Sequence, residues 1–402
     1  MKEVAIVAGV RTPFGRYGGS LRGFDGIDLS ALVMRKALKR VNLSGEYVDE
    51  VFWGVGDTAS CKDVYTPVLA RQALLKAGLP AETVSTSFDK ACVSASSAIL
   101  CAWQAIRTGD SAVGLAGGVT TFSQMPLVVR NLRFDGHRLG PVTMEDPLFQ
   151  LGYKDYNPVA VDAGEVALEH GVSRQEQDEW AMRSHTLYGA AHSAWKFREE
   201  MIPLQITEKG KEPRLLDIDQ QYRANISLEK LAALPTIYGS PTCTAGNSPG
   251  LNDGATCVVL IEKSKAVELG LEVLATVVGG ATVALQPRLL AEAPNKAIRT
   301  ALKKADLPLS EMKLIEINEA FAAVTLVSSK MLGDGDAAAV RDIRARLNVN
   351  GGAIAAGHPN TASGARLVMT MMYELRRRGG GYGVAAICGG LAQGDAVIIK
   401  VD

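Results

Sequence analysis

A repeated order of elements is the feature of this sequence that most constrains its fold. Residues 84–118 run from a polar approach through a turn of small residues and a helical stretch to a short apolar strand that ends in Gly-Gly. Residues 347–390 pass through the same order and also end in Gly-Gly. Two pairs of shorter segments also resemble each other and occur in the same order in both halves: 3–9 with 272–280, and 48–54 with 312–318. Chance similarity between α/β segments is the alternative, but the ordered recurrence favours duplication of one α/β unit.

The two repeats flank a less regular stretch. Strand patterns alternate with helical patterns in both repeats, which predicts packed α/β layers. Residues 119–250 carry little periodicity apart from a helix expected over 173–197, where Ser173 and Glu176 form a capping-box pattern. We therefore expect an N-terminal half over 1–118 with part of 251–271, a loop domain over 119–250, and a C-terminal half over 272–402. A long insertion of this kind is usually functional.

Charge and composition exclude several classes of protein. The 402 residues include 43 basic and 43 acidic side chains, so neither a nucleic-acid surface nor a polybasic membrane anchor is indicated. No apolar run reaches the roughly 20 residues of a membrane span, and the first residues lack the apolar core of a signal peptide. The cysteines show neither CxxC pairs nor zinc spacing, so we expect no metal site and reduced thiols in a cytoplasmic protein: Cys61, Cys92, Cys101, Cys243, Cys257 and Cys388.

Cys92 stands in KACVSASSAIL, at the entrance of a helix made of small residues. The free amide hydrogens and partial positive charge of a helix N-terminus favour a thiolate, the reactive form of cysteine. The alternative is a buried small hydrophobic residue, the commoner fate of a lone cysteine.

His358 stands in GGAIAAGHPNTASG, in the turn of the second repeat that corresponds to the turn of Cys92. Equivalent turns of duplicated halves meet near a pseudo-twofold axis, so we expect the two side chains to approach each other. A Cys–His pair is a common way to activate a thiol. The alternative is a histidine held by turn backbone. We interpret the remaining histidines as surface or structural residues: His137, His170, His185 and His192.

Two further candidates stand at expected strand ends, which face the site crevice in α/β proteins. Cys388 precedes Gly389 and Gly390, which allow close backbone approach. Asn318, followed by Glu319, leads into a helix. A buried strand cysteine and a helix N-cap are the respective alternatives.

Taken together, these segments resemble the thiolases across nearly the whole chain. The resemblance rests on KACVSAS, LNDGA, INEAFA, NGGAIAAGHP and CGG in this order, with GGVTTFSQMP between the first two. It implies the five-layered αβαβα thiolase fold of two similar halves with an inserted loop domain. It also implies thiolytic cleavage of a 3-oxoacyl-CoA to acetyl-CoA, or another short acyl-CoA, and a shortened acyl-CoA, or the reverse Claisen condensation, through an acylated cysteine.

The resemblance assigns roles to five residues. Cys92 is the expected nucleophile, His358 activates it, and Cys388 moves the α-proton of acetyl-CoA. Asn318 holds a water that completes one oxyanion hole with His358, and the amides of Cys92 and Gly390 form the other. Coenzyme A or acyl-CoA is the expected substrate, with no tightly bound cofactor and no metal. The residues expected along the coenzyme A arm are Arg223, Tyr238, Ala245, Pro249 and Phe321, with a solvated surface charge as the alternative for Arg223.

Some positions depart from the usual family pattern. Thr120, Thr121, Pro158, Val159, Pro249, Asn360 and Thr361 stand where other residue types are usual. They lead us to expect an acyl pocket that takes a bulkier or more polar group than acetoacetyl, unless the changes compensate one another locally.

Three alternatives accompany the expected activity: biosynthetic acetoacetyl-CoA synthesis, a decarboxylating condensing enzyme on the same fold, and a catalytically silent thiolase-like scaffold. The second catalytic cysteine, Cys388, argues against the condensing enzyme, and the intact set of four side chains argues against silence. We expect at least a homodimer, with the loop at 122–158 as the added contact if a tetramer forms. Acyl-chain preference, direction, pathway and a further partner subunit are not specified by the sequence.

Overall fold

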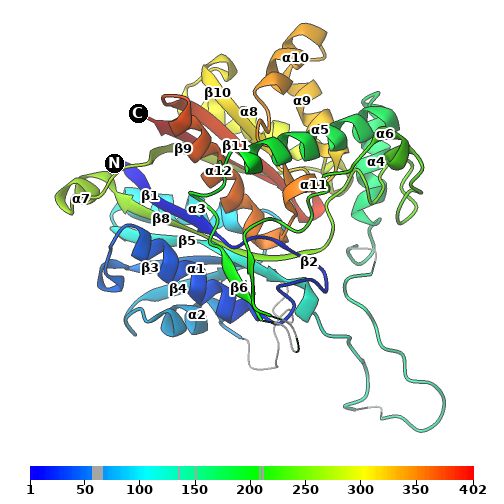
Figure 1. The fold of residues 1–402 in the computed structure, drawn as a ribbon, viewed down its shortest axis with the longest axis horizontal. Coiled ribbons are helices and arrows are strands. Elements are labelled where there is room, and N and C mark those ends of the chain that lie inside the picture. Colours follow the sequence, from blue (N-terminus) through cyan, green and yellow to red (C-terminus); the bar gives the residue numbers. More distant parts are fainter. Residues whose placement is uncertain (57–66, 135, 150–151, 208–209, 211) are drawn as a thin grey trace.

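A mixed β-sheet runs through the molecule and joins the two halves of the chain (Figure 1). The computed structural model describes residues 1–56, 67–134, 136–149, 152–207, 210 and 212–402. Along the sheet the described strands follow the order β10 (Met312–Ile317), β11 (Gly381–Gly389), β12 (Gln393–Val401), β9 (Ala275–Ala284), β1 (Val4–Arg11), β8 (Asn252–Glu262), β5 (Val113–Thr121), β3 (Glu50–Val55) and β4 (Val84–Phe88), with β2 (Gly15–Arg16) beside β8.

The junction between the halves is short. β1 pairs with β9 through Val4, Ala5 and Ile6 only, whereas β1 pairs with β8 along its whole length. The sheet is thus two half-sheets that share a narrow seam. β8 follows the loop domain in sequence but lies between β1 and β5, within the N-terminal half-sheet.

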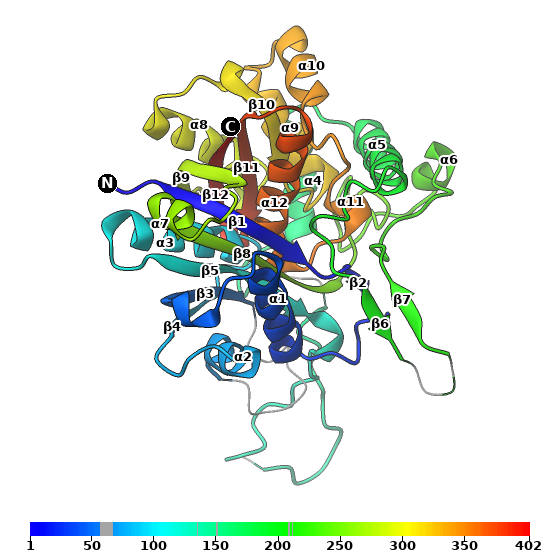
Figure 2. The same cartoon turned by 60° about the vertical axis from the view of Figure 1, so that its left-hand side comes forward.

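Helices cover both faces of each half-sheet and produce five layers (Figure 2). One apolar core lies under α1 (Gly26–Arg40) and α2 (Leu69–Ala77), on the outer face of the N-terminal half-sheet. A second lies around α3 (Ser94–Thr108) and α12 (Ser363–Arg377), between the half-sheets. A third lies under α8 (Ala293–Ala305) and α9 (Ala322–Leu332). The expected αβαβα thiolase architecture is confirmed.

The position of the central helices between the half-sheets explains why their sequences differ from those of surface helices. Every residue of α12 from Ser363 to Leu375 is buried, because the helix has a half-sheet on each side. A helix surrounded by protein needs apolar or small residues on most of its faces, and the charged residues buried on α12, Arg366 and Glu374, are ion-paired. The outer helix α1 instead keeps a charged end at Lys39 and Arg40.

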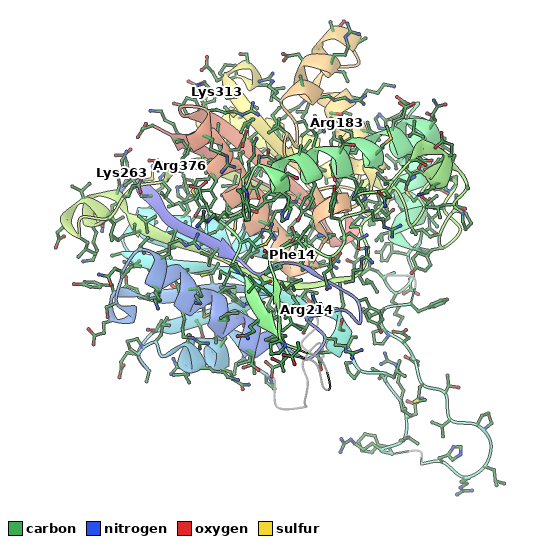
Figure 3. All side chains as sticks on the ribbon, viewed as in Figure 1. Phe14, Arg183, Arg214, Lys263, Lys313 and Arg376 are labelled. Atoms are coloured by element: carbon green, nitrogen blue, oxygen red, sulfur yellow. The ribbon has the colours of Figure 1, made fainter. Side chains whose placement is uncertain are left out.

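The loop domain is fixed to the C-terminal half by its longest helix. α5 (Arg174–Ser193) begins after the capping box of Ser173 and Glu176, as expected, and ends before the predicted boundary. Its Arg183, labelled in Figure 3, donates to the carbonyl oxygen of Leu347 at 2.8 Å. The other elements of this region and of the chain are α4 (Val159–Glu169), β6 (Leu204–Ile206), β7 (Arg214–Leu216), α6 (Leu228–Ala232), α7 (Lys263–Glu268), α10 (Ala337–Ala345) and α11 (Ala353–Ala356).

A buried ionic cluster fixes the loop domain to the N-terminal half. Arg11 at the end of β1 donates to Glu200 at 2.7 Å and to Asp219 at 2.7 Å. Tyr188 of α5 donates to the same Asp219 at 2.8 Å. Because buried charges are tolerated only when paired and hydrogen-bonded, these contacts hold the domain in one orientation.

The chain between β5 and α4 extends away from this body as a long arm (Figure 1). Phe134 is 92% exposed and Leu139 is 94% exposed. Large apolar side chains at such exposure are typical of a contact surface for another protein. Among the described residues, no helix combines the length and apolar character needed to cross a membrane.

Candidate active site

The turn that carries Cys92 is strained and tightly held. Ala91 has a φ of 48°, a conformation that is uncommon for residues other than glycine. The Ser94 hydroxyl donates to the carbonyl oxygen of Ala91 at 2.7 Å and accepts from the amide of Lys90 at 2.9 Å. These bonds lock the turn, so that Cys92 is presented just ahead of α3.

The thiol of Cys92 does not ionise by itself. Burial raises the pKa of Cys92 to about 12, with a smaller upward contribution from Asp89. The start of α3 was expected to favour the thiolate, but the loss of water around the sulfur outweighs that effect. The thiol is therefore protonated near neutral pH and needs a base to accept its proton.

His358 lies in contact with that thiol. Its Nε2 lies 3.2 Å from the Cys92 sulfur, and its Nδ1 lies 2.6 Å from the Ser363 hydroxyl. The Ser363 hydroxyl hydrogen is donated to the carbonyl oxygen of Pro359, so its oxygen accepts from Nδ1–H. The lone pair of Nε2 consequently faces the thiol. Burial, aided by the charge of Arg366, lowers the pKa of His358 to about 3, which keeps the ring neutral.

The LNDGA segment holds the backbone under His358. Asn252 accepts from the amide of His358 at 2.8 Å through Oδ1 and donates to the carbonyl oxygen of Gly15 at 3.0 Å through Nδ2. Gly357, at φ 103°, passes so close that a Cβ there would lie 2.9 Å from the Asn252 side chain. A structural asparagine thus accounts for this part of the motif.

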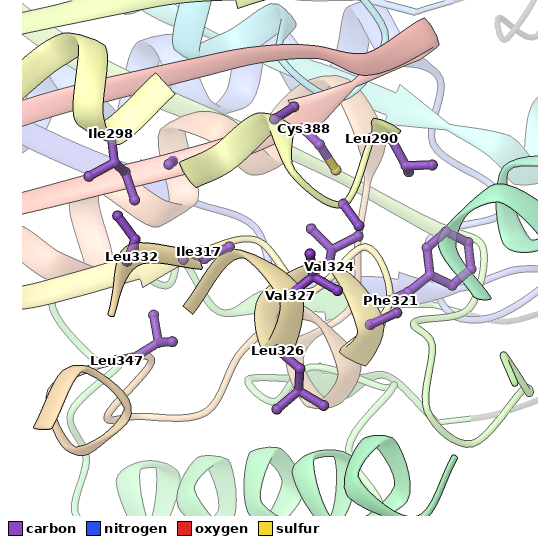
Figure 4. Close-up of a cluster of buried hydrophobic side chains, with 14 of the residues drawn as sticks. Leu290, Ile298, Ile317, Phe321, Val324, Leu326, Val327, Leu332, Leu347 and Cys388 are labelled. Carbon is purple, nitrogen blue, oxygen red and sulfur yellow. The ribbon is translucent and has the colours of Figure 1, made fainter. Parts of the chain in front are cut away.

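Cys388 lies at the end of β11, where that strand meets the turn of Cys92. A Cβ on Gly389 would lie 2.9 Å from the Val93 side chain and 3.0 Å from the Lys90 carbonyl oxygen. Cys388 itself is buried at the edge of the apolar core of the C-terminal half, near Leu290 and Val324 (Figure 4). Burial and the neighbouring Cys92 both raise the pKa of Cys388, so this thiol is protonated at rest.

Asn318 completes the group of predicted side chains. Its Nδ2 lies 3.3 Å from Nε2 of His358. The alternative that Asn318 caps a helix is wrong, because α9 begins at Ala322 and its N-cap position is Phe321. The sequence neighbour Glu319 points elsewhere: it accepts from Trp180 at 2.9 Å and from Ser184 at 2.7 Å, both on α5.

Two residues of the site were missed by the sequence reasoning. Ser363 is an ordinary small residue at a helix start, and only its contact with His358 reveals a role. Tyr153 belongs to the irregular stretch, where no periodicity indicates a site residue, and it is 36% exposed, yet its hydroxyl packs directly against Gly390. Burial of that hydroxyl raises the pKa of Tyr153, with further contributions from Cys92, Asp89 and Cys388.

A cavity of about 160 Å³ opens on the loop-domain side, between α5 and the segments that surround α6. Arg223 and Ala245 line it, whereas Tyr238, Pro249 and Phe321 do not. Tyr238 is exposed and its ring packs edge-on against Phe149, and Phe321 is buried. The cavity also contains His185, which is buried and accepts from the amide of Arg223 at 3.2 Å. His185 is therefore part of the cavity wall as well as a structural residue.

Two of the unusual residues compensate each other. The hydroxyl of Thr120 lies 3.0 Å from that of Thr361 and accepts from the amide of Thr361 at 3.1 Å. Both side chains are buried, and Thr361 also donates to the carbonyl oxygen of Val119. This pair therefore links β5 to the turn before α12, and neither hydroxyl is free to contact a substrate. These two positions give no support to an altered acyl pocket.

Comparison with known proteins agrees with this geometry. Models of the thiolase N-terminal domain and the thiolase C-terminal domain match residues 4–264 and 271–401. The chain belongs to the thiolase family and is an acyltransferase.

Its relatives include two kinds of thiolase. It is 38% identical to an acetyl-CoA acetyltransferase of Chromobacterium violaceum, over 99% of both chains. It is also 38% identical to the human mitochondrial 3-ketoacyl-CoA thiolase, over 100% of this chain and 98% of the relative. The crystal structure of that human enzyme superposes with a TM-score of 0.93 at 37% identity, covering 100% of this chain and 99% of the other. A structure of the human enzyme with CoA superposes with a TM-score of 0.92 at 37% identity, covering 100% of this chain and 98% of the other.

Proposed function

We propose that this thiolase cleaves a 3-oxoacyl-CoA with coenzyme A through an acyl-Cys92 intermediate, and that it can run the reverse Claisen condensation. The observation that carries the proposal is the 3.2 Å approach of a neutral His358 to the Cys92 thiol, with a second protonated thiol, Cys388, beside the same turn. Cys92 takes up the acyl group, and Cys388 exchanges the α-proton of acetyl-CoA.

In the first half-reaction, His358 Nε2 accepts the proton of Cys92 as the sulfur attacks the 3-oxo carbon. The bond between C2 and C3 breaks, and its electron pair leaves as the enolate of acetyl-CoA. Cys388 donates its proton to the enolate carbon. The products of this step are acetyl-CoA, acyl-Cys92 and a Cys388 thiolate.

In the second half-reaction, the Cys388 thiolate accepts the proton of an incoming coenzyme A thiol. The coenzyme A sulfur attacks the acyl-Cys92 carbonyl carbon, and the Cys92 sulfur leaves. His358 returns its proton to Cys92, which restores the enzyme and releases the shortened acyl-CoA. Splitting one reaction into two acyl transfers produces ping-pong kinetics.

Negative charge develops on an oxygen atom in both half-reactions, and two sets of hydrogen-bond donors stabilise it. Asn318, through a water, and protonated His358 stabilise the thioester enolate. The backbone amides of Cys92 and Gly390 stabilise the tetrahedral oxygen on the acyl carbon. Fixed donors in a dry site stabilise such charge far better than water does, and loss of one costs roughly 10²–10³ in rate.

Coenzyme A would approach from the cavity lined by Arg223 and Ala245. The structure of the human relative in complex with CoA supports coenzyme A as the substrate. Tyr238, Pro249 and Phe321 remain candidates for contacts farther along the arm. No tightly bound cofactor is needed, because coenzyme A is consumed and released as a substrate.

The chemistry can be tested with a thiolysis screen over short, long, branched and aromatic 3-oxoacyl-CoA substrates. We expect turnover of at least one class, with ping-pong kinetics. The silent-scaffold alternative would give neither turnover nor protection of Cys92 from iodoacetamide by acetyl-CoA. Biosynthetic acetoacetyl-CoA synthesis would show as condensation of acetyl-CoA that outpaces thiolysis at physiological concentrations.

We further propose a cytoplasmic homo-oligomer that acts in acyl-chain degradation. The described cysteines are all unpaired, which fits a reducing compartment, and Cys61 lies outside the described residues. β4 ends the N-terminal half-sheet, and its Val84 is 59% exposed. An exposed strand edge needs a cover, and a second copy of the chain would supply it.

A further inference from the structure

A buried cation lies directly behind the His358–Asn318 pair. Arg366 is 2% exposed and projects from α12. Its Nη1 lies 3.4 Å from an oxygen of Glu316, and its Nη2 lies 3.4 Å from Oδ1 of Asn318. Its Nε has no partner among the described residues. A guanidinium is costly to bury, and Glu316, 3.4 Å away, compensates it only in part, because burial raises the pKa of Glu316 to about 8.

The contact with Asn318 determines which way that amide points. An arginine has donors only, so the atom that faces Nη2 must be the amide oxygen. The amide N–H₂ is then turned toward Nε2 of His358, 3.3 Å away. If the amide rotated by 180°, its NH₂ group would face the guanidinium and its oxygen would face the site. Arg366 therefore selects the one orientation in which Asn318 donates into the site.

The charge of Arg366 acts on the same histidine. A second proton on His358 would place two positive charges in one buried region, and like charges disfavour that state. Burial is the larger cause of the lowered pKa of His358, and Arg366 is the other cause. Protonated His358 could not accept the thiol proton, and the two effects together keep that form from being populated at physiological pH.

We propose that Arg366 is a positioning residue of the thiolase site, which presents the Asn318 N–H to the reacting atoms and keeps His358 unprotonated before Cys92 is acylated. The inference rests on the proposed function of His358 as the base at Cys92. Other titratable or charged groups also act on these residues, and their contributions persist when Arg366 is replaced: Asp89 before α3, Tyr153 on the arm, Cys388 on β11, and Glu316 on β10 with its neighbours Glu319, Glu200 and Arg183.

The experiment measures the rate of acetyl transfer from acetyl-CoA to Cys92 between pH 5 and pH 8, by quenching and mass spectrometry. The wild-type rate should show no acidic limb in this range, because His358 stays neutral. Arg366→Gln should bring an acidic limb into the range, since removal of a nearby like charge raises a pKa by roughly 1–3 units. Arg366→Lys keeps the charge and should stay flat.

Arg344→Gln is the matched control, because Arg344 is a partly buried arginine whose hydrogen bonds go to Ser329 and Leu326 on α9. The pH profile of acetyl transfer by the Arg344→Gln variant should match that of the wild type. An Arg366→Gln rate that falls equally at every pH would show a purely structural role and would overturn the charge argument. Failure of wild-type enzyme to form acetyl-Cys92 at all would instead refute the proposed function.

Asn318→Asp tests the orientation of the Asn318 amide without altering Arg366. It still tests the positioning role of Arg366 if Arg366→Gln does not fold. The new carboxylate can accept from Arg366 but has no N–H to present. We expect thiolysis to fall by roughly 10²–10³, as for loss of an oxyanion donor, and to match Asn318→Ala. Near-normal thiolysis by Asn318→Asp would show that the N–H face is not required, and would overturn the positioning role of Arg366.

Discussion

The Ser363 hydroxyl lies 2.6 Å from Nδ1 of His358, and this contact fixes the tautomer of that histidine. The serine hydrogen is committed to the carbonyl oxygen of Pro359. The hydroxyl oxygen therefore accepts the Nδ1 hydrogen, and the other nitrogen is left with its lone pair toward Cys92.

Loss of this contact should slow acylation without abolishing it. Ser363→Ala leaves Nδ1–H buried without a partner, at a cost of about 1–3 kcal/mol, or roughly a 5- to 150-fold loss in the rate of acetyl-Cys92 formation. Ser363→Thr retains a hydroxyl and should recover part of the rate. Single-turnover acylation by acetyl-CoA provides the measurement. Equal rates for the alanine variant and the wild type would mean that the tautomer is set elsewhere.

The two cysteines should fail in different ways. Cys92→Ala should lose both the acyl-enzyme and turnover. Cys388→Ala should still accept an acetyl group on Cys92 but fail at the carbon–carbon step, because positioned proton transfer contributes typically 10²–10⁴ in rate. Mass spectrometry of the two active-site peptides after incubation with acetyl-CoA distinguishes them. An acetyl group found on Cys388 would reverse the assignment.

Tyr153 should limit the space beside Gly390. Tyr153→Ala removes the ring and should raise kcat/KM for longer 3-oxoacyl chains relative to acetoacetyl-CoA, at about 0.8 kcal/mol, or roughly fourfold, for each additional buried methylene. Tyr156→Ala is the control, since Tyr156 belongs to the same segment and is 50% exposed. A chain-length profile that shifts equally in both variants would point to the arm as a whole.

Stability should fall in acid partly because of His358. Its pKa is about 3 in the folded protein against an ordinary value of 6.5. Below pH 6.5 the unfolded chain therefore binds a proton that the native site refuses, and stability is lost as pH falls toward 3, at up to about 1.4 kcal/mol per pH unit. His358→Gln should lose less stability than wild type between pH 6 and pH 4, as followed by Tm. Parallel Tm curves would contradict this.

The chain should be at least a dimer in solution. Light scattering at micromolar protein should report a mass near twice 42.6 kDa or a higher multiple. Val84→Lys places a charge on the exposed edge of β4 and should weaken the association, whereas Val267→Lys, on a valine of α7 that is 70% exposed, should not. A monomeric mass for the wild type would refute the prediction.

The sequence predicted those parts of the site that depend on order along the chain. The repeat placed Cys92 and His358 in equivalent turns, and the motifs brought in Cys388 and Asn318. Contacts between distant segments with no periodic pattern were not predictable. Tyr153 reaches Gly390 from an irregular arm, and the bond between Thr120 and Thr361 appears in sequence only as two unusual residues. The ionisation of Cys92 was also misjudged, because the degree of burial depends on packing and not on position in a helix.

Glu319 has a consequence for how substrates reach the enzyme. Its carboxylate receives hydrogen bonds from α5 of the loop domain, from Asn348 and from the amide of Ile354. Any outward swing of α5 would leave this carboxylate buried without two of its donors, so the inserted domain cannot serve as a moving lid. Substrates must enter through openings that already exist. Selection for new acyl groups would therefore act on the arm and the cavity walls, where side chains can change while the catalytic frame keeps its shape.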